Sequence, residues 1–164
     1  MRSVLFIRHA KSSWDDPLMN DYDRPLNDRG KKDAPQMAMY LLEKKIPIDS
    51  FISSPAKRAR KTAALFAKTF GVDEAAIQLK SELYLPDEVA FFHVIKTASD
   101  NYAHLAIFSH NPGITNFVNS LTSQIRVHDV PTCGIFAIKT NAVSWKDFEK
   151  SEKGFWFFDY PKNH

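Results

Sequence analysis

The chain contains 164 residues, and its composition of 44% hydrophobic and 25% charged residues is that of a soluble globular protein rather than a disordered one. Its formal net charge of +3 is too small, and its basic residues are too scattered, to indicate a nucleic-acid-binding surface. No apolar run approaches the roughly 20 residues of a membrane span or the roughly 7–15 residues of a secretory signal.

The only cysteine, Cys133, excludes an intrachain disulfide and fits a reducing compartment. Its apolar surroundings indicate a small buried side chain and not a nucleophile. We therefore expect one domain over residues 1–164 in the cytoplasm, with neither nucleic acid nor a membrane among its partners.

The first predicted element is the apolar run Val4–Ile7, which Arg8 and His9 follow directly. Four consecutive apolar residues predict a short strand that is buried on both faces. Ligands of open α/β sheets bind beyond the carboxyl ends of the strands, so this cation and this imidazole are candidates for a binding site. The alternative is that both side chains only face solvent at the end of the strand.

The polar stretch Lys11–Asn27 follows, and it is long for a connection inside a compact domain, which favours a functional loop. Arg24 within it is a candidate phosphate contact, although a surface arginine is an equally good interpretation. Asn27 is a good N-cap for a helix that runs to about Lys45. Pro35 either kinks this helix or marks its true start. The residues that form its apolar stripe are Ala34, Met37, Ala38, Leu41 and Leu42.

A second short strand at Phe51–Ile52 leads to Ser54 and Pro55, which we expect to serve as the N-cap and the first residue of the next helix. Arg58 then falls in the first helical turn. Exposed amide donors and the positive end of the helix dipole already favour an anion there, and a guanidinium adds a planar fork that matches phosphate oxygens.

The third predicted strand, Ile77–Leu85, precedes a helix over Asp87–Ser99. The fourth strand, Leu105–Ser109, ends at His110, and Asn111-Pro112 begins another helix. Two strands with no helix between them, Cys133–Ile138 and Phe155–Tyr160, extend the sheet at one edge. These elements predict an α/β fold, a three-layer α/β/α sandwich with a mostly parallel mixed central sheet.

Three predicted strand ends therefore bring Arg8, His9, Arg58 and His110 to one edge of the sheet. Two arginines suit an anion, and phosphate is the best candidate because it accepts bidentate forks. A neutral imidazole near pH 7 is an available nucleophile. We expect no metal, because no short metal-ligand spacing occurs among the histidines at 9, 93, 104, 110, 128 and 164.

Arg8-His9, the run Ser54–Ala63 and His110 together resemble the histidine phosphatase superfamily. The segment Arg24–Gly30 is similar to that family's Pro-Leu-Thr-x-x-Gly segment, with Asn27 where threonine is usual. The resemblance implies that His9 is the nucleophile and that Arg8, Arg58 and His110 form a phosphate pocket, with no cofactor. Ala10 after Arg-His is typical of the smaller SixA-type phosphohistidine phosphatases, whereas Ser109 stands where many members have glycine.

The leaving group decides between substrates within this family. Expelling an alkoxide needs a strong general acid, and the segment Ile77–Glu88 offers only Glu82, Asp87 and Glu88. Of these, Glu82 is a possible proton donor, whereas Asp87 is better placed as a helix cap. An imidazole leaves more easily, because its conjugate acid titrates near 6.5.

We therefore predict a phosphatase of signal transduction that hydrolyses phosphohistidine in a protein, such as a phosphotransfer domain. The alternatives are a phosphomonoesterase of the same superfamily that acts on a small phosphorylated metabolite, and a phosphate-binding adaptor without turnover.

Overall fold

The computed structural model describes residues 1–164 and contains one six-stranded sheet with the strand order β3-β2-β4-β1-β5-β6. The four strands β1 to β4 pair in parallel, whereas β5 runs antiparallel to both β1 and β6. This is the mostly parallel mixed sheet that the sequence predicts. The strands are β1 Arg2–Arg8, β2 Ser50–Ser53, β3 Gln78–Leu79, β4 His104–Ser109, β5 Ile135–Thr140 and β6 Lys153–Asp159.

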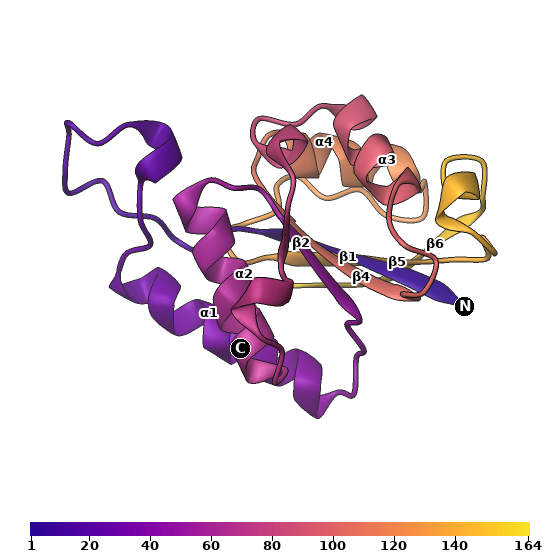
Figure 1. Ribbon diagram of the computed structural model, residues 1–164, viewed down its shortest axis with the longest axis horizontal. Helices are drawn as coiled ribbons and strands as arrows, with labels where there is room; N and C mark the ends of the chain where they lie inside the picture. Colours follow the sequence, from indigo (N-terminus) through magenta and orange to yellow (C-terminus); the bar gives the residue numbers. More distant parts are fainter.

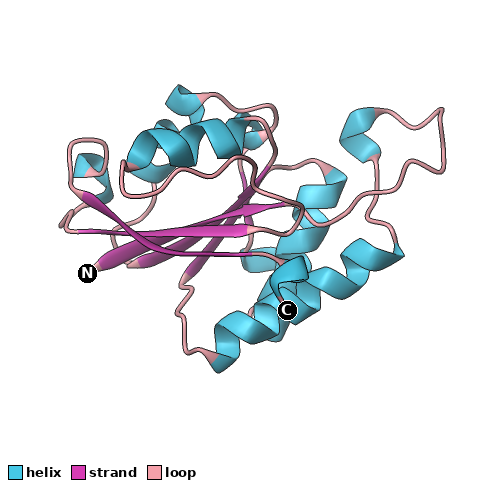
Figure 2. Cartoon of the chain, turned by 180° about the vertical axis from the view of Figure 1, so that it is seen from behind, coloured by secondary structure: helices cyan, strands magenta, loops and turns pink.

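Helices cover both faces of the sheet (Figure 1) and complete the three layers. One face carries α1 and α2, and the other carries α3 and α4, as the view from behind also shows (Figure 2). None of these helices combines the length and the apolar character needed to cross a membrane. Their bounds are α1 Asp28–Glu43, α2 Lys57–Thr69, α3 Glu88–Lys96 and α4 Gly113–Leu121.

The central strand β1 is buried on both faces, as its unbroken apolar run predicts. Val4 and Phe6 belong to the core under α3 and α4, whereas Leu5 and Ile7 belong to the core under α1 and α2. Each such side chain contributes about 1.5–3 kcal/mol when it is fully buried. The two cores therefore fix the position of β1, and with it the residues that follow its carboxyl end.

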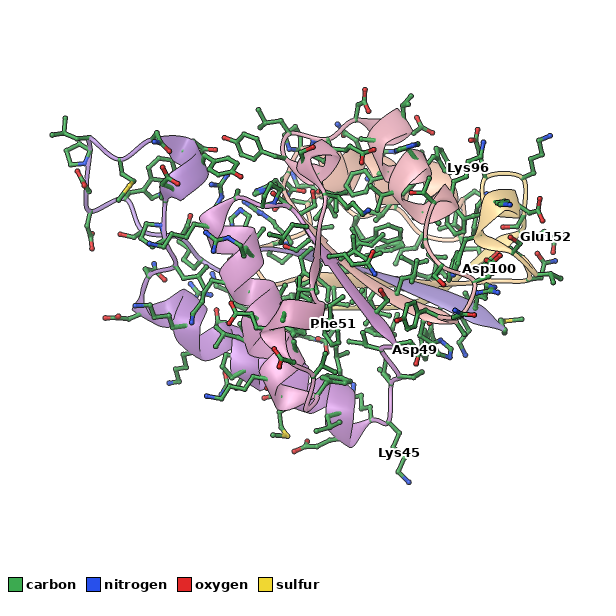
Figure 3. All side chains as sticks on the ribbon, viewed as in Figure 1. Lys45, Asp49, Phe51, Lys96, Asp100 and Glu152 are labelled. Carbon is green, nitrogen blue, oxygen red and sulfur yellow. The ribbon has the colours of Figure 1, made fainter.

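Carboxylates make structural hydrogen bonds at the end of the sheet opposite the carboxyl ends of its parallel strands. Asp49 precedes β2, and its carboxylate accepts hydrogen bonds from the backbone nitrogens of Ala103 and His104 at 3.1 and 3.0 Å. Asp100 precedes β4 and accepts from the backbone nitrogen of Trp145 at 2.8 Å. Figure 3 shows both carboxylates at the end of the molecule away from the long loop between β1 and α1. The carboxyl edge is thus left for a site.

The prediction of a strand over Ile77–Leu85 was wrong for most of its length. Only Gln78 and Leu79 pair with β2, because β2 itself ends at Ser53 and offers no further partner. The chain then turns through a short 3-10 helix, η3 (Ser81–Leu83), which places Leu83 in the core with no exposed surface. The alternation of polar and apolar residues was a poor guide at this sheet edge.

The starts of one helix and one strand differ from the predicted ones. The helix α2 begins at Lys57 with Ala56 at the cap position, so Ser54 is not its N-cap. The strand β5 begins only at Ile135. The Asn27 cap of α1 is confirmed, and Pro35 does not mark the helix start, because it lies inside a helix that begins at Asp28.

Two single-residue predictions need correction as well. Leu42 is 42% exposed, so it is not part of the buried stripe of α1. Cys133 is buried as predicted, but it precedes β5 and has a φ of 59°.

Gly30 allows α1 to pack against the loop that follows β1. A Cβ atom at this position would overlap the backbone oxygen of Lys11, which also accepts a hydrogen bond from the Asn27 nitrogen at 3.0 Å. Lys11 is only two residues from His9, so the first turn of α1 supports the segment that carries the imidazole.

We expect Gly30→Ala to lower the free energy of unfolding by about 1–3 kcal/mol, the usual cost of overpacking. Alanine favours a helix over glycine by about 1 kcal/mol, so a stabilised variant would show that the overlap is absent. The measurement is urea unfolding. Gly154→Ala is the matched control, because the nearest atom to its new Cβ is 4.0 Å away, and we expect a change of less than about 0.5 kcal/mol.

Candidate active site

The structure brings Arg8, His9, Arg58 and His110 together at the carboxyl edge of the sheet. Arg8 ends β1 and His9 follows it, His110 follows β4, and Arg58 lies in the first turn of α2. The rings of His9 and His110 are 5.3 Å apart between centroids, and Arg58 Nε donates to His9 Nε2 at 3.3 Å. Buried cations and imidazoles at this edge form a cluster suited to an anion.

One hydrogen bond sets the tautomer of His9. Its Nδ1 lies 2.7 Å from the backbone oxygen of Ala10, and a carbonyl oxygen can only accept, so Nδ1 carries the hydrogen. The lone pair is then on Nε2, where the N–H of Arg58 points. Burial lowers the pKa of His9 well below 6.5; His110, Arg58 and Arg8 lower it further, and the bond to Ala10 opposes them. His9 is therefore a neutral imidazole at pH 7, with its lone pair on Nε2.

Thr62 on α2 holds the backbone that orients His9. Its Oγ1 accepts from the Ala10 nitrogen at 3.0 Å and donates to the backbone oxygen of Arg58 at 2.7 Å. On the other side, the Cys133 nitrogen contacts the oxygens of both Arg8 and His9, at 3.1 and 3.0 Å. Sequence reasoning gave Thr62 no role, although its place four residues after Arg58 puts both on one helix face.

His110 is held by Ser54. The imidazole Nε2 lies 2.7 Å from Ser54 Oγ, which also accepts from the Ala56 nitrogen at 3.2 Å. With Ser54 as donor, His110 Nδ1 carries the hydrogen, and this buried atom has no partner in the structure. Burial lowers the pKa of His110 to about 3, with Arg58 acting in the same direction. His110 is therefore neutral at pH 7, and in the tautomer that accepts from Ser54 it presents an unpaired Nδ1–H.

Arg8 is less buried than the other three residues. Its Nη1 donates to the Val130 oxygen at 2.9 Å and lies 3.7 Å from the Asp129 carboxylate, while its buried Nε has no partner. Burial lowers the pKa of Arg8, which Asp129 opposes. These contacts hold the guanidinium in place beside His9.

Sequence reasoning missed a carboxylate in this cluster. Asp21 belongs to the short 3-10 helix η1 (Asp21–Asp23), and its Oδ2 accepts from Arg58 Nη2 at 3.0 Å and from the Tyr84 hydroxyl at 2.7 Å. Burial acts to raise its pKa, but hydrogen bonds from Tyr84, Arg58 and Arg24 hold it well below the usual range. Asp21 is therefore ionised at pH 7 and cannot act as a general acid there.

Arg24 lies on the far side of Asp21. It is 8% exposed, donates from Nη2 to Asp21 Oδ1 at 3.1 Å, donates from Nη1 to the Ser12 hydroxyl, and stacks on the Trp14 ring at 3.8 Å. The surface-arginine interpretation is therefore wrong. Arg24 reaches the cluster through Asp21.

The side chain of Glu82, a possible proton donor from the sequence, contacts α3 and not the four clustered residues. Its carboxylate pairs with Nδ1 of His93 on α3, and it makes no hydrogen bond or ion pair with the four clustered residues. Asp87 accepts from the Ala90 nitrogen at 2.8 Å and caps α3, as the sequence predicts. The structure thus shows no contact through which Glu82 would donate a proton in this cluster.

Other parts of the molecule offer no competing arrangement of this kind. An apolar cavity of about 290 Å³ opens between α1 and β6, lined by Met37, Tyr40 and Trp156 among others, and it contains none of the clustered residues. Nowhere do three His, Cys, Asp or Glu side chains converge as metal ligands would.

The lowered pKa values of both histidines make stability depend on pH. In the unfolded chain each imidazole binds a proton as the pH falls through about 6.5, whereas in the folded protein His110 does so only near 3 and His9 well below 6.5. The stability associated with the neutral rings is thus present above pH 6.5 and is lost as the pH falls below it.

We expect this loss to approach about 1.4 kcal/mol per pH unit for each histidine. His110→Gln should therefore show a shallower decrease than wild type in urea unfolding between pH 6.5 and 4.5. The exposed His128, changed to glutamine, serves as the control and should keep the wild-type slope. Equal slopes for wild type and His110→Gln would contradict the neutral buried ring.

Residues 4–84 match the model of the histidine phosphatase superfamily (branch 1). Among curated proteins, an uncharacterised chloroplast protein of Arabidopsis thaliana is 28% identical, over 94% of this chain and 74% of that one. An uncharacterised protein of Mycobacterium leprae is 29% identical, over 95% of this chain and 100% of that one. Neither relative carries an assigned activity.

Solved structures share the fold along nearly the whole chain. The protein histidine phosphatase SixA complexed with tungstate superposes with a TM-score of 0.83 at 20% identity, covering 98% of both chains. The SixA protein of Agrobacterium tumefaciens, a candidate phosphohistidine phosphatase, gives 0.80 at 23% identity, again over 98% of both. A mycobacterial glucosyl-3-phosphoglycerate phosphatase gives 0.69 at 12% identity, over 95% of this chain and 97% of that one.

Proposed function

Since this chain belongs to the histidine phosphatase superfamily, we propose that it hydrolyses the N–P bond of phosphohistidine in a protein substrate, through a covalent intermediate on His9. The observation that carries the proposal is the hydrogen bond of 2.7 Å between His9 Nδ1 and the Ala10 oxygen, which places the lone pair of the ring on Nε2, facing Arg58 Nε in a buried, cationic cluster. Attack on a phosphoryl group requires a neutral nucleophile with cationic side chains beside it, and here arginines supply them.

In the first step, His9 Nε2 attacks phosphorus in line with the bond to the substrate imidazole. The P–N bond breaks, and its electron pair goes to the substrate ring, which leaves as a neutral imidazole when its far nitrogen is protonated. Arg8 and Arg58 bind the phosphoryl oxygens by forked contacts, and His110 Nδ1 donates to a third oxygen. The positive charge that develops on the His9 ring is stabilised by the Ala10 oxygen.

In the second step, water attacks phosphorus and the P–Nε2 bond breaks. The electron pair returns to His9, which recovers its neutral form with the hydrogen still on Nδ1, and the proton lost by water goes to solvent. The phosphate is then released. The same hydrogen bond to Ala10 thus serves both steps, because His9 is first the nucleophile and then the leaving group.

The absence of a usable acid favours an imidazole leaving group. Asp21 is the carboxylate held by the cluster, and its pKa lies well below the usual range, while Glu82 pairs with His93. An alkoxide would have to be expelled without a proton donor, whereas an imidazole needs only a proton on its far nitrogen. A phosphotransfer domain that bears a phosphohistidine is the protein substrate we propose, and the fold shared with SixA supports this choice.

The intermediate gives the direct test. We expect label from a phosphohistidine protein to appear on His9, because the hydrogen bond to Ala10 places the lone pair of the ring on Nε2. The reaction is quenched in base, where phosphohistidine survives and acyl phosphates do not, and the label is mapped by mass spectrometry. His9→Asn should carry no label, while His93→Gln, changed outside the cluster, should be labelled like wild type. Label on another residue would overturn the assignment.

Substrate choice is tested with a phosphohistidine peptide and a phosphoserine peptide of the same sequence. We expect faster hydrolysis of phosphohistidine, and we expect Glu82→Gln to change that rate by less than about threefold, since no acid has to reach the P–N bond. Asp87→Asn is the matched control, because asparagine also caps a helix. Faster phosphoserine hydrolysis, or a loss of roughly 10²-fold or more in Glu82→Gln, would indicate a small-metabolite phosphatase.

A further inference from the structure

Three of the four clustered residues are nearly inaccessible to solvent: His9 is 6% exposed, Arg58 is 4% exposed and His110 is 2% exposed. Arg8 is more open, with 24% of its side chain exposed. A nucleophile that reacts with a group carried by another molecule has to be reached by it. A contact around His9 and Arg58 therefore has to give way before a phosphoryl group can approach.

Asp21 accounts for the closure at Arg58. The Nε of Arg58 donates to His9, its Nη1 donates to the backbone oxygen of Asp21 at 2.5 Å, and its Nη2 donates to the Asp21 carboxylate at 3.0 Å. Three of the five N–H groups of Arg58 are thus engaged within the protein, and Asp21 takes both of the contacts made by the terminal nitrogens. Release of Asp21 would free these two donors for a forked contact with a phosphoryl group.

The contacts around the Asp21 carboxylate are those of an anion site. Besides Arg58, the carboxylate accepts from Arg24 at 3.1 Å and from the Tyr84 hydroxyl at 2.7 Å. Two guanidinium groups and a hydroxyl converge on one group of oxygens, and these donors would serve a phosphoryl oxygen equally well. The Asp21 carboxylate therefore accepts hydrogen bonds that an external anion could accept in its place.

The segment that carries Asp21 can leave without disturbing the core. Its base is fixed by backbone hydrogen bonds, from the Ser13 nitrogen to the Pro25 oxygen and from the Asn27 nitrogen to the Lys11 oxygen. Between these points, no residue of η1 is buried, and the loop stands away from the sheet at the left of Figure 1. Its tip meets the body through the Asp21 contacts and through the ring of Tyr22, which packs against Tyr84.

We propose that Asp21 is an internal competitor of the phosphoryl group: it occupies Arg58, Arg24 and Tyr84 in the free protein, and substrate binds by displacing it together with the tip of the Lys11–Asn27 loop. The proposal rests on the proposed function, because it takes a phosphoryl group as the incoming anion. Replacement of the Asp21 carboxylate by a phosphoryl group is favourable, since the phosphoryl group brings three oxygens and a higher negative charge to the same donors. The Asp21 side chain is 47% exposed, so water can replace the contacts that it gives up.

Tungstate, an oxyanion that mimics phosphate, is the probe, and its dissociation constant is measured by calorimetry. We expect Asp21→Asn to bind tungstate about tenfold more tightly than wild type, because the dissociation constant of a largely closed site falls as its open fraction rises. Asp23→Asn is the matched control: it removes the same charge two residues away, from a side chain that makes no ion pair, and we expect less than a twofold change. If tungstate bound more tightly to both variants by the same factor, the cause would be the loss of one negative charge from the loop and not the loss of the Asp21 contacts. That result would overturn the competition by Asp21.

A double-mutant cycle gives an independent test. Tyr84→Phe removes one contact of Asp21 and also one donor that the anion would take over. In the wild-type background the two effects oppose each other, and we expect a change in tungstate affinity of less than about twofold. In the Asp21→Asn background only the lost donor counts, and we expect tungstate binding to weaken by about threefold. Additive effects in the two backgrounds would show that Tyr84 does not act through Asp21 and would overturn the proposal.

The outcomes separate this proposal from the proposed function. If wild type and Asp21→Asn bind tungstate with the same affinity while phosphohistidine is still hydrolysed, the competition by Asp21 is wrong and the phosphatase assignment stands. If neither binds tungstate and neither hydrolyses phosphohistidine, both proposals are overturned together, because the competition presupposes an anion site.

Discussion

The hydrogen bond between His9 Nδ1 and the Ala10 oxygen is the contact on which the rest of the site depends. It fixes the tautomer, and without it the lone pair could be on either ring nitrogen. The bond exists only because the backbone of Ala10 is itself held by Thr62 and because β1 is clamped between two apolar cores. Packing that looks purely structural thus determines which ring nitrogen carries the lone pair.

The second constraint is electrostatic. Arg24 and Arg58 are buried close to two neutral imidazoles, and buried guanidinium groups are costly unless an anion compensates for them. The Asp21 carboxylate supplies that anion to both, while the half-buried Arg8 lies 3.7 Å from the carboxylate of Asp129. The burial that depresses the histidine pKa values is a consequence of the same closed arrangement.

Much of this could be predicted from the sequence because strand ends are easy to recognise. The run Val4–Ile7 marked the central strand, and Arg8, His9, Arg58 and His110 each follow a predicted strand end closely enough to be placed at one edge. Asp21 could not be found this way, because several carboxylates share its loop and no periodicity distinguishes the one that turns inward. Ser54 was predicted as a helix N-cap because Ser-Pro is a good helix start. In the structure the helix begins at Lys57, and the Ser54 hydroxyl contacts His110 instead.

The start of α2 links substrate binding to the orientation of the nucleophile. Arg58 contacts His9 through its side chain, and its backbone oxygen accepts from Thr62, which in turn accepts from Ala10. The guanidinium that would bind the phosphoryl group and the carbonyl that orients His9 are therefore two hydrogen bonds apart. Thr62 Oγ1 has a single hydrogen, which it gives to the Arg58 oxygen, so it can only accept from the Ala10 nitrogen. The start of α2 therefore positions both the guanidinium beside His9 Nε2 and the backbone that sets the tautomer of His9, and a substitution in its first turns acts on both.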